Sequence, residues 1–307
     1  MSAGANKSIL IAGTGAMACL FAAKLSSAGL QVYIMGTWTE GLEALKLHGV
    51  RLVDLLDAES SHPVRVITSP EECTGMRYAL VLVKSWQTAR AAQALKVCLA
   101  PEGIVLTLQN GLGNRECLTE ALGLERVALG VTTIGATMLG PGRVRQAGEG
   151  GISLGEHSNL GSLPLWLKAA GFRLDFVEDT ESLMWGKLVI NAAINPLTGL
   201  LRVPNGELLN SEPTRVLMHR TAQEAAQVAI KMGLELPFQD PVKVVDDVAQ
   251  KTALNISSML QDIRRGARTE IDAINGAIVS AGESVGIPTP INYTLWQLIR
   301  AYEAINK

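Results

Sequence analysis

The chain has 307 residues, of which 48% are hydrophobic and 18% are charged, so it can bury a large core and fits two domains better than one. Its formal net charge is −2 without a basic tail or stripe, which argues against nucleic acid as a partner. The four cysteines lack CxxC spacing and the four histidines are scattered, so we predict neither a disulfide framework nor a metal site.

The first predicted strand, Ile9–Ala12, leads into a Gly-x-Gly-x-x-Ala pattern. A helical stretch, Cys19–Leu30, and a second strand, Val32–Met35, follow in the order that a dinucleotide-binding turn requires. Its glycines allow a tight bend and a close approach to a pyrophosphate, which faces the free N–H groups of the helix N-terminus. An ordinary tight turn is the alternative. We predict cofactor contacts from Gly13, Thr14, Gly15, Ala16, Met17 and Ala18.

The uncharged run over residues 8–23 also resembles the core of a signal peptide. It is too short to span a bilayer, and the glycine spacing explains it better. We therefore expect a soluble, cytoplasmic protein that does not bind a membrane.

Further apolar runs before residue 178 alternate with helical stretches, a pattern typical of a parallel sheet covered on both faces. These strands are predicted at Ala79–Val83, Ile104–Gln109, Val127–Thr132, Gly151–Leu154 and Arg173–Val177. The Gly/Pro-rich turn over residues 139–142 suggests that the last strands form a hairpin-like edge.

Two polar residues directly follow predicted strands of this sheet, Lys84 and Asn110. Ligands of open α/β sheets bind at the carboxyl ends of the strands, so Lys84 could contact phosphate and Asn110 could hydrogen-bond a cofactor. Because Asn110 precedes a glycine, a simple turn is the alternative for it.

From Glu181 to the end, helical periodicity punctuated by prolines replaces the strand pattern. We therefore predict an α/β dinucleotide-binding domain over residues 1–178 and an all-α domain over residues 179–307. The cleft between two such domains is the default place for an active site.

Lys187, Asn191 and Asn195 are spaced four residues apart in an otherwise apolar helical stretch, so their side chains share one face. A cation and two amides on a buried helix are costly without partners, and asparagine is a poor residue inside a helix. We interpret the three as functional; a solvated polar stripe is the alternative.

A second polar cluster follows in the same half of the chain. We expect Asn255 and Ser258 on one helix face and Gly266 at the end of that helix. Thr269, followed three residues later by an aspartate, predicts a helix start. Glu270 would then lie in the first turn, where the helix dipole favours its ionised form. The alternative is that Glu270 is only a residue at the start of a helix and has no role in a site.

Together these motifs resemble the ketopantoate reductase (2-dehydropantoate 2-reductase) family, in order and over essentially the whole chain. The most specific are the helix that runs from Lys187 to Asn195-Pro-Leu-Thr and the segment Asn255-Ile-Ser-Ser-Met-Leu-Gln-Asp-Ile. The resemblance implies a Rossmann-type domain followed by a helical domain like that of 6-phosphogluconate dehydrogenase. It also implies that NADPH reduces 2-dehydropantoate to (R)-pantoate, a step towards pantothenate and coenzyme A.

The resemblance also implies roles for single residues. Lys187 looks like the proton donor, because an ammonium at the ketone oxygen stabilises the developing charge and then supplies the proton. Glu270 looks like a catalytic residue that helps place cofactor and substrate. Substrate contacts are implied for Lys187, Asn191, Asn195, Asn205, Asn255 and Ser258. Cofactor contacts are implied for Lys84, Asn110, Ala136 and Glu270, beside the glycine turn.

One departure from the family pattern follows the second strand. Many members carry an arginine there that faces the 2′-phosphate of NADP, whereas this chain has Thr37. No Asp or Glu ends the strand either, as NAD recognition would prefer. We keep NADP as the expected cofactor, with Lys84 able to hold the phosphate alone.

Two other functions stay open. A related NAD(P)-dependent dehydrogenase would keep Lys187 but act on another 2-oxo acid. A non-catalytic NADPH-sensing protein should have lost the polar face of the second domain, which is present here. The apolar face of the helical domain could support a homodimer.

Overall fold

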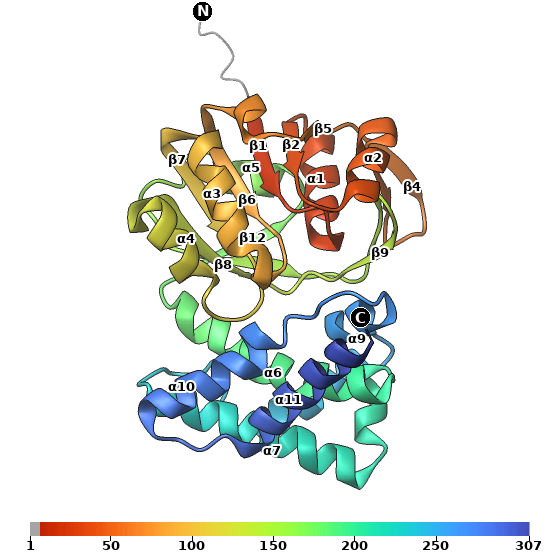
Figure 1. Cartoon of the computed structure of the whole chain (residues 1–307), viewed down its shortest axis with the longest axis vertical. Helices are drawn as coiled ribbons and strands as arrows, with labels where there is room; N and C mark the ends of the chain where they lie inside the picture. Colours follow the sequence, from red (N-terminus) through yellow and green to blue (C-terminus); the bar gives the residue numbers. More distant parts are fainter. Residues whose placement is uncertain (1–6, 307) are drawn as a thin grey trace, which may run out of the picture. The chain divides into compact units, whose positions relative to one another are not determined.

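The computed structural model describes residues 7–306. The chain forms two compact units (Figure 1). The first comprises residues 7–109 and Asn114–Thr180, and the second comprises Asn110–Gly113 and residues 181–306. The division falls two residues after the boundary proposed from the sequence, and the short segment Asn110–Gly113 is an addition that the sequence did not indicate.

The first unit contains an eight-stranded sheet with the order β12-β11-β8-β7-β6-β1-β2-β5 (Figure 1). All its neighbours pair in parallel except β8 and β11, which are antiparallel. All seven strands predicted from apolar runs are present. The strands are β1 Ser8–Ala12, β2 Gln31–Met35, β5 Arg65–Ile67, β6 Met76–Val81, β7 Leu99–Thr107, β8 Val127–Thr132, β11 Gly151–Gly155 and β12 Arg173–Val177.

Helices cover both faces of this sheet, as the alternation of side chains in β1 shows. Ile9 and Ile11 belong to the apolar core formed with α1 and α5, whereas Leu10 belongs to the core formed with α3 and α4. Successive residues of a strand point to opposite faces, so the uninterrupted apolar run of β1 serves both layers. The helices are α1 Ala16–Ser27, α2 Thr39–His48, α3 Thr88–Cys98, α4 Asn114–Leu122 and α5 Leu163–Ala169.

The order of the strands reverses at β1. From β1 the chain first builds the sheet through β2 to β5, and then returns to β6 on the other side of β1 and continues to β7 and β8. In open parallel sheets ligands bind at the carboxyl ends of the strands at such a switch point. The end of β1, where the glycine turn begins, therefore lies at the expected binding position.

The predicted hairpin exists, but it is not an edge of the large sheet. The turn at residues 141–142 joins two antiparallel strands of a separate four-stranded sheet with the order β4-β3-β10-β9. Its other two strands, β3 and β4, have four residues each, and β4 is polar and mostly exposed, so neither forms a long apolar run. The strands are β3 Val50–Val53, β4 Glu59–His62, β9 Ala136–Gly140 and β10 Arg143–Gln146.

The second unit is helical, and its described residues contain no strand. This confirms the predicted fold class of a Rossmann-type sheet followed by an all-α region. The helices are α6 Thr180–Leu201, α7 Glu212–Lys231, α8 Pro241–Lys251, α9 Ser258–Arg264, α10 Ala277–Val285 and α11 Pro290–Ile305, with a 3₁₀ turn η4 at Asn205–Leu209 and a π-helical turn η5 at Asp272–Gly276. Within residues 7–306, no helix combines the length and apolar character needed to cross a membrane.

Candidate functional site

Gly13 occupies a position that only glycine can fill. Its φ is +137°, and a methyl group at this residue would lie 2.8 Å from the carbonyl oxygen of Leu82. The Gly13 N–H donates to the carbonyl of Met35 at the end of β2 (2.8 Å), and the Leu82 N–H donates to the carbonyl of Ala12 (2.8 Å). The turn after β1 is thus fastened to both neighbouring strands, and a side chain at residue 13 would separate them.

Gly15 has a different reason for being glycine. Its φ is −78°, which any residue adopts, and a methyl group here would meet no atom within 4 Å. Gly15 is the N-cap of α1, whose first turn has neither a side-chain cap nor an acidic residue. The backbone N–H groups at this helix start suit an anion, and the absent side chain leaves room for one to approach. The turn therefore fits the pyrophosphate of a dinucleotide.

The other residues of the turn hold α1 against the sheet. Ala18 is fully buried, as its predicted role of close helix packing requires. Thr14 is also buried, and its side chain fills the space beside Gly36, where a methyl group would lie 2.7 Å from Thr14 Cγ2. Ala16 and Met17 are half-buried and pack against the core that α1 shares with the sheet.

Amide side chains connect the loops that follow β2, β6 and β7. Gln87 Nε2 donates to the hydroxyl of Thr37, 2.9 Å away. Gln109 Nε2 donates to the carbonyl of Val83 (2.9 Å) and to the hydroxyl of Thr88 (2.8 Å). Neither glutamine was assigned a role from the sequence, although both lie within a few residues of strand ends.

Lys84 and Ala136 lie in the first unit and Asn110 in the second. Lys84 is half-buried immediately before the 3₁₀ turn η2, Ser85–Gln87. Ala136 begins β9 and packs against the same core as Ala16. Asn110 begins the short segment of the second unit in which the Leu112 N–H donates to the carbonyl of Ala273 (2.9 Å).

The helix α6 brings Lys187, Asn191 and Asn195 onto one face, because it is continuous from Thr180 to Leu201. Lys187 and Asn191 are half-buried and Asn195 is buried. Burial lowers the pKa of the Lys187 ammonium to about 8, and the negative charge of Glu270 opposes that shift. An ammonium with such a pKa can donate a proton near neutral pH.

Glu270 is buried, with 6% of its surface exposed, and it lies two residues before η5 rather than in the first turn of a helix. The backbone carbonyl of Glu270 accepts hydrogen bonds from the N–H groups of Ala273 and Ile274, both at 3.1 Å. The two residues from which a helix start was predicted do not cap it together. The Thr269 hydroxyl accepts the N–H of Ile271 (3.3 Å), but the aspartate three residues after Thr269 accepts a hydrogen bond from the indole of Trp296 instead (2.8 Å).

Asn205 is buried and held at both its backbone and its side chain. Its N–H donates to the carbonyl of Asn255 (3.0 Å), and its Nδ2 donates to the hydroxyl of Thr252 (2.9 Å). The Thr252 hydroxyl donates its single hydrogen to the carbonyl of Val248, so toward Asn205 it can only accept. The nitrogen of the Asn205 amide therefore faces Thr252, and its oxygen points the other way. The Asn205 Oδ1 has no hydrogen-bond partner among the described residues. A substrate hydroxyl could satisfy it.

The prediction that Asn255 and Ser258 share a helix face was wrong. Asn255 is exposed in the loop before α9, and the helix begins only at Ser258. The hydroxyl of Ser257 caps it by accepting the N–H of Leu260 (3.1 Å), and Thr198 of α6 donates to that same hydroxyl (2.7 Å). This long-range bond fixes the start of α9 and could not be inferred from local periodicity. The predicted end of the helix was right, since Gly266 follows it with a φ of +63°.

Comparison with known proteins identifies the family. The family model described as "Ketopantoate reductase PanE/ApbA" matches residues 9–159, and the model of its C-terminal region matches residues 179–303. The 2-dehydropantoate 2-reductase of Archaeoglobus fulgidus is 39% identical over 301 residues, which is 96% of this chain and 98% of that protein. The chain belongs to the ketopantoate reductase family.

Solved structures of similar proteins support the same fold. A PanE/ApbA family ketopantoate reductase from Ralstonia eutropha JMP134 is 32% identical with a TM-score of 0.90, and 97% of this chain and 99% of that chain are covered. A D-mandelate dehydrogenase in complex with NADH and anilino(oxo)acetate is 26% identical with a TM-score of 0.89, at the same coverage.

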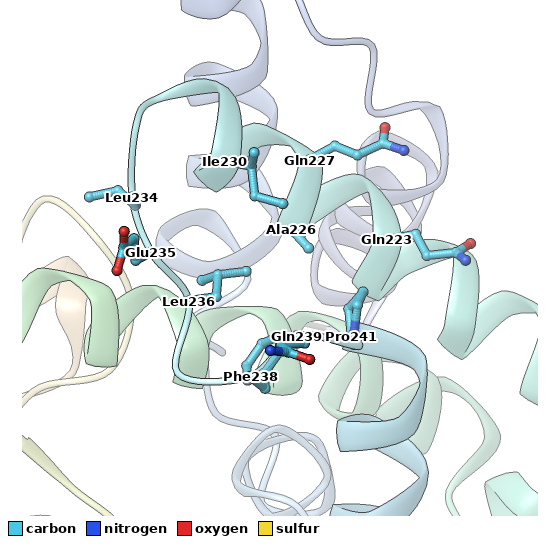
Figure 2. Close-up of a pocket in the computed structure, with 10 residues that line it drawn as sticks. All are labelled: Gln223, Ala226, Gln227, Ile230, Leu234, Glu235, Leu236, Phe238, Gln239 and Pro241. Atoms are coloured by element: carbon cyan, nitrogen blue, oxygen red, sulfur yellow. The ribbon is translucent and has the colours of Figure 1, made fainter.

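This member of the ketopantoate reductase family also has a surface hollow of about 690 Å³ on α7 and the loop that follows it (Figure 2). None of the candidate site residues lines it. The loop passes over α6, where Pro237 packs against Gly186, the residue before Lys187. Residues 7–306 contain no group of three or more His, Cys, Asp or Glu side chains placed to hold a metal ion.

Proposed function

We propose that this chain reduces 2-dehydropantoate to (R)-pantoate with NADPH, a step towards pantothenate. The observation that carries the proposal is the electrostatic interaction of Lys187, whose pKa burial lowers to about 8, with the buried Glu270. Lys187 lies on the face of α6 that also carries Asn191 and Asn195. The full-length relative that is 39% identical bears the name of this activity.

The residues of the second unit suit the chemistry. NADPH, when bound, supplies the hydride to the ketone carbon. Negative charge then grows on the ketone oxygen, and the ammonium of Lys187 stabilises it and donates its proton, which leaves a hydroxyl and a neutral amine. Asn191, Asn195 and Asn205 offer amides that can hold hydroxyl and carboxylate groups without adding charge to the site.

The glycine turn of the first unit suits the cofactor. The open space at Gly15 and the uncapped start of α1 fit a pyrophosphate. Lys84, which follows β6, is the cation of this unit that we assign to the 2′-phosphate, because Thr37 stands where family members carry arginine. NADH is the alternative, and the structural relative that binds NADH gives it weight.

The second candidate function is the reduction of another 2-oxo acid. It is favoured by one specific observation, the likeness to a D-mandelate dehydrogenase at a TM-score of 0.89. Such an enzyme would use the same ammonium on a ketone that bears a different side chain.

The deciding experiment follows the loss of absorbance of NADPH or NADH with ketopantoate, with phenylglyoxylate and with a short panel of other 2-oxo acids. Fast oxidation of NADPH with ketopantoate alone supports the proposal. Preference for phenylglyoxylate or for NADH overturns the assignment of substrate or cofactor. Cofactor binding without turnover of any 2-oxo acid would make the chain a sensor.

We further propose that the enzyme works in the reducing environment of the cytoplasm and forms a homodimer. The four cysteines are free thiols, which suits such an environment. Sedimentation equilibrium would measure the oligomeric state, and a monomer at micromolar concentration would contradict the dimer.

A further inference from the structure

The helix α6 has a proline in its interior, Pro196. Proline has no N–H, so the carbonyl of Ala192, four residues earlier, lacks its helical donor. The side chain of Asn275 supplies one instead: its Nδ2 lies 3.1 Å from the carbonyl oxygen of Ala192. Both residues have no exposed surface, so an unpaired carbonyl here would be costly.

The orientation of the Asn275 amide is determined by its neighbours. Asn292 Nδ2 donates to the carbonyl of Thr221 (3.1 Å) and to the carboxylate of Glu224 (2.9 Å), and these groups only accept. The Asn292 Oδ1 therefore faces Asn275. It accepts the other hydrogen bond that the Asn275 Nδ2 donates (3.0 Å). Both hydrogens of the Asn275 amide are thus committed, one of them to Ala192.

Asn275 stands between the two segments that carry the candidate catalytic groups. It belongs to η5, a turn anchored on Glu270, whose carbonyl accepts the N–H groups of Ala273 and Ile274. On the other side, Ala192 follows Lys187 on α6 by about one and a half turns. One buried side chain therefore connects the helix of Lys187 to the turn that follows Glu270. Wide turns of this π type occur often at functional sites.

We propose that Asn275 is a positioning residue of the active site, which sets the spacing between Lys187 and Glu270 by tying η5 to the carbonyl of Ala192. The inference rests on the proposed function, since it assumes that Lys187 donates the proton. The competing explanation is that Asn275 only repairs the helical hydrogen bond that Pro196 removes.

A double-mutant experiment separates the two explanations. Asn275→Ala removes both the tie and the donor, so we expect kcat to fall up to about 100-fold, as misplaced catalytic groups typically cause. We expect KM for NADPH to stay unchanged. Pro196→Ala returns a helical N–H to Ala192 but does not restore the tie. The double variant should therefore recover the part of the thermal stability that the unpaired Ala192 carbonyl costs, although the Asn292 oxygen still lacks its donor, and keep the loss of kcat. Full recovery of kcat in the double variant, or an unchanged kcat in Asn275→Ala, would overturn the proposal.

A second readout does not need turnover. Glu270 is the charged group on the facing segment that raises the pKa of Lys187. In Asn275→Ala this influence weakens, so the pH midpoint of Lys187 labelling by an amine-reactive probe, followed by peptide mass, should move to lower pH. An unmoved midpoint contradicts the proposal. Met218→Ala, a buried apolar truncation in α7, is the control that lowers stability and leaves the midpoint in place.

The outcomes distinguish this proposal from the proposed function. If none of the 2-oxo acids causes the wild-type chain to oxidise NADPH, the proposed function is wrong. The pH midpoint of Lys187 labelling still decides whether Asn275 sets the spacing between Lys187 and Glu270. If Asn275→Ala does not fold alone, the same comparison is made in the Pro196→Ala background, where the Ala192 carbonyl has its helical donor.

Discussion

The carboxylate of Glu270 raises the pKa of Lys187 against the larger downward effect of burial, and the balance leaves that pKa at about 8. The proton donor of the proposed reaction therefore loses its proton just above neutral pH. We expect kcat/KM for ketopantoate reduction to be level below this pKa and to fall about tenfold per pH unit above it. Initial rates across a pH series measure the alkaline limb. A level profile through two further pH units would remove Lys187 from this role.

Glu270→Gln keeps the shape of the side chain and removes its charge. The remaining effect on Lys187 is burial, which lowers its pKa, so the alkaline limb should move to lower pH. Asp272→Asn is a matched control, because that nearby carboxylate binds Arg268 and Trp296 instead. Equal pH profiles for the two variants would contradict the coupling between Glu270 and Lys187.

Lys187→Ala removes the proposed proton donor. General acid catalysis typically contributes about 100- to 10,000-fold, and we expect turnover to fall by a factor in this range. Binding of NADPH, measured by quenching of tryptophan fluorescence, should persist. Lys231→Ala changes an exposed lysine at the end of α7 and should leave turnover unchanged. Turnover retained in Lys187→Ala would mean that another group donates the proton.

Patterns within about eight residues carried most of what the sequence could predict. Buried apolar runs located every strand of the large sheet except β5, and the spacing of Lys187, Asn191 and Asn195 placed them on one helix face. The start of α9 was misjudged, because it depends on a hydrogen bond between Thr198 and Ser257, which are 59 residues apart. No local pattern contains such a contact.

The contact between Asn275 and Ala192 could not be predicted for the same reason, because it too joins residues far apart in the sequence. Asn275 reaches Ala192 across 83 residues, and in the sequence it is one more asparagine in a helical stretch. The strand β4 of the small sheet was missed for a different reason: it is Glu-Ser-Ser-His and mostly exposed, so it has no apolar alternation. Pairing with β3, rather than composition, makes it a strand.

The two glycines of the turn after β1 should respond differently to alanine. Gly13→Ala combines a strained φ with a contact of 2.8 Å to Leu82, so we expect the free energy of unfolding to fall by about 1–3 kcal/mol or more. Gly15→Ala should leave stability nearly unchanged and weaken NADPH binding at least about tenfold. Urea unfolding and titration calorimetry measure the two effects. Gly29→Ala is the control for strain alone, because Gly29 has a φ of +84° and no atom nearby. Normal NADPH affinity in Gly15→Ala would contradict the pyrophosphate assignment.

The choice between NADPH and NADH can be tested at Lys84 and Thr37. Lys84→Ala should weaken NADPH binding and leave NADH binding unchanged, because only NADPH carries the 2′-phosphate. Thr37→Arg adds a guanidinium after β2 and should raise the preference for NADPH about tenfold, as a charge-assisted hydrogen bond would. Thr37→Val removes the bond from Gln87 without adding charge and serves as control. Equal losses for both cofactors in Lys84→Ala would separate Lys84 from the 2′-phosphate.

Gly186, the residue before Lys187, packs closely against Pro237. A methyl group at residue 186 would lie 2.5 Å from Pro237 Cγ and 2.8 Å from its Cδ. Gly186→Ala must therefore push the loop after α7 outward or shift α6, and overpacking of this kind costs about 1–3 kcal/mol. We expect lower stability in urea together with a lower kcat, because Lys187 is the next residue.

Pro237→Ala removes the ring that the new methyl group would meet. The double variant should therefore lose less stability than the sum of the two single changes, since the variants share one contact. The loop also carries Leu236 and Phe238, which line the hollow on α7 (Figure 2), so the single Gly186→Ala change should alter the fluorescence of a dye bound there. If the losses of unfolding free energy in the two single variants add up to that of the double variant, α6 shifts rather than the loop. The loop would then not hold Lys187 in place.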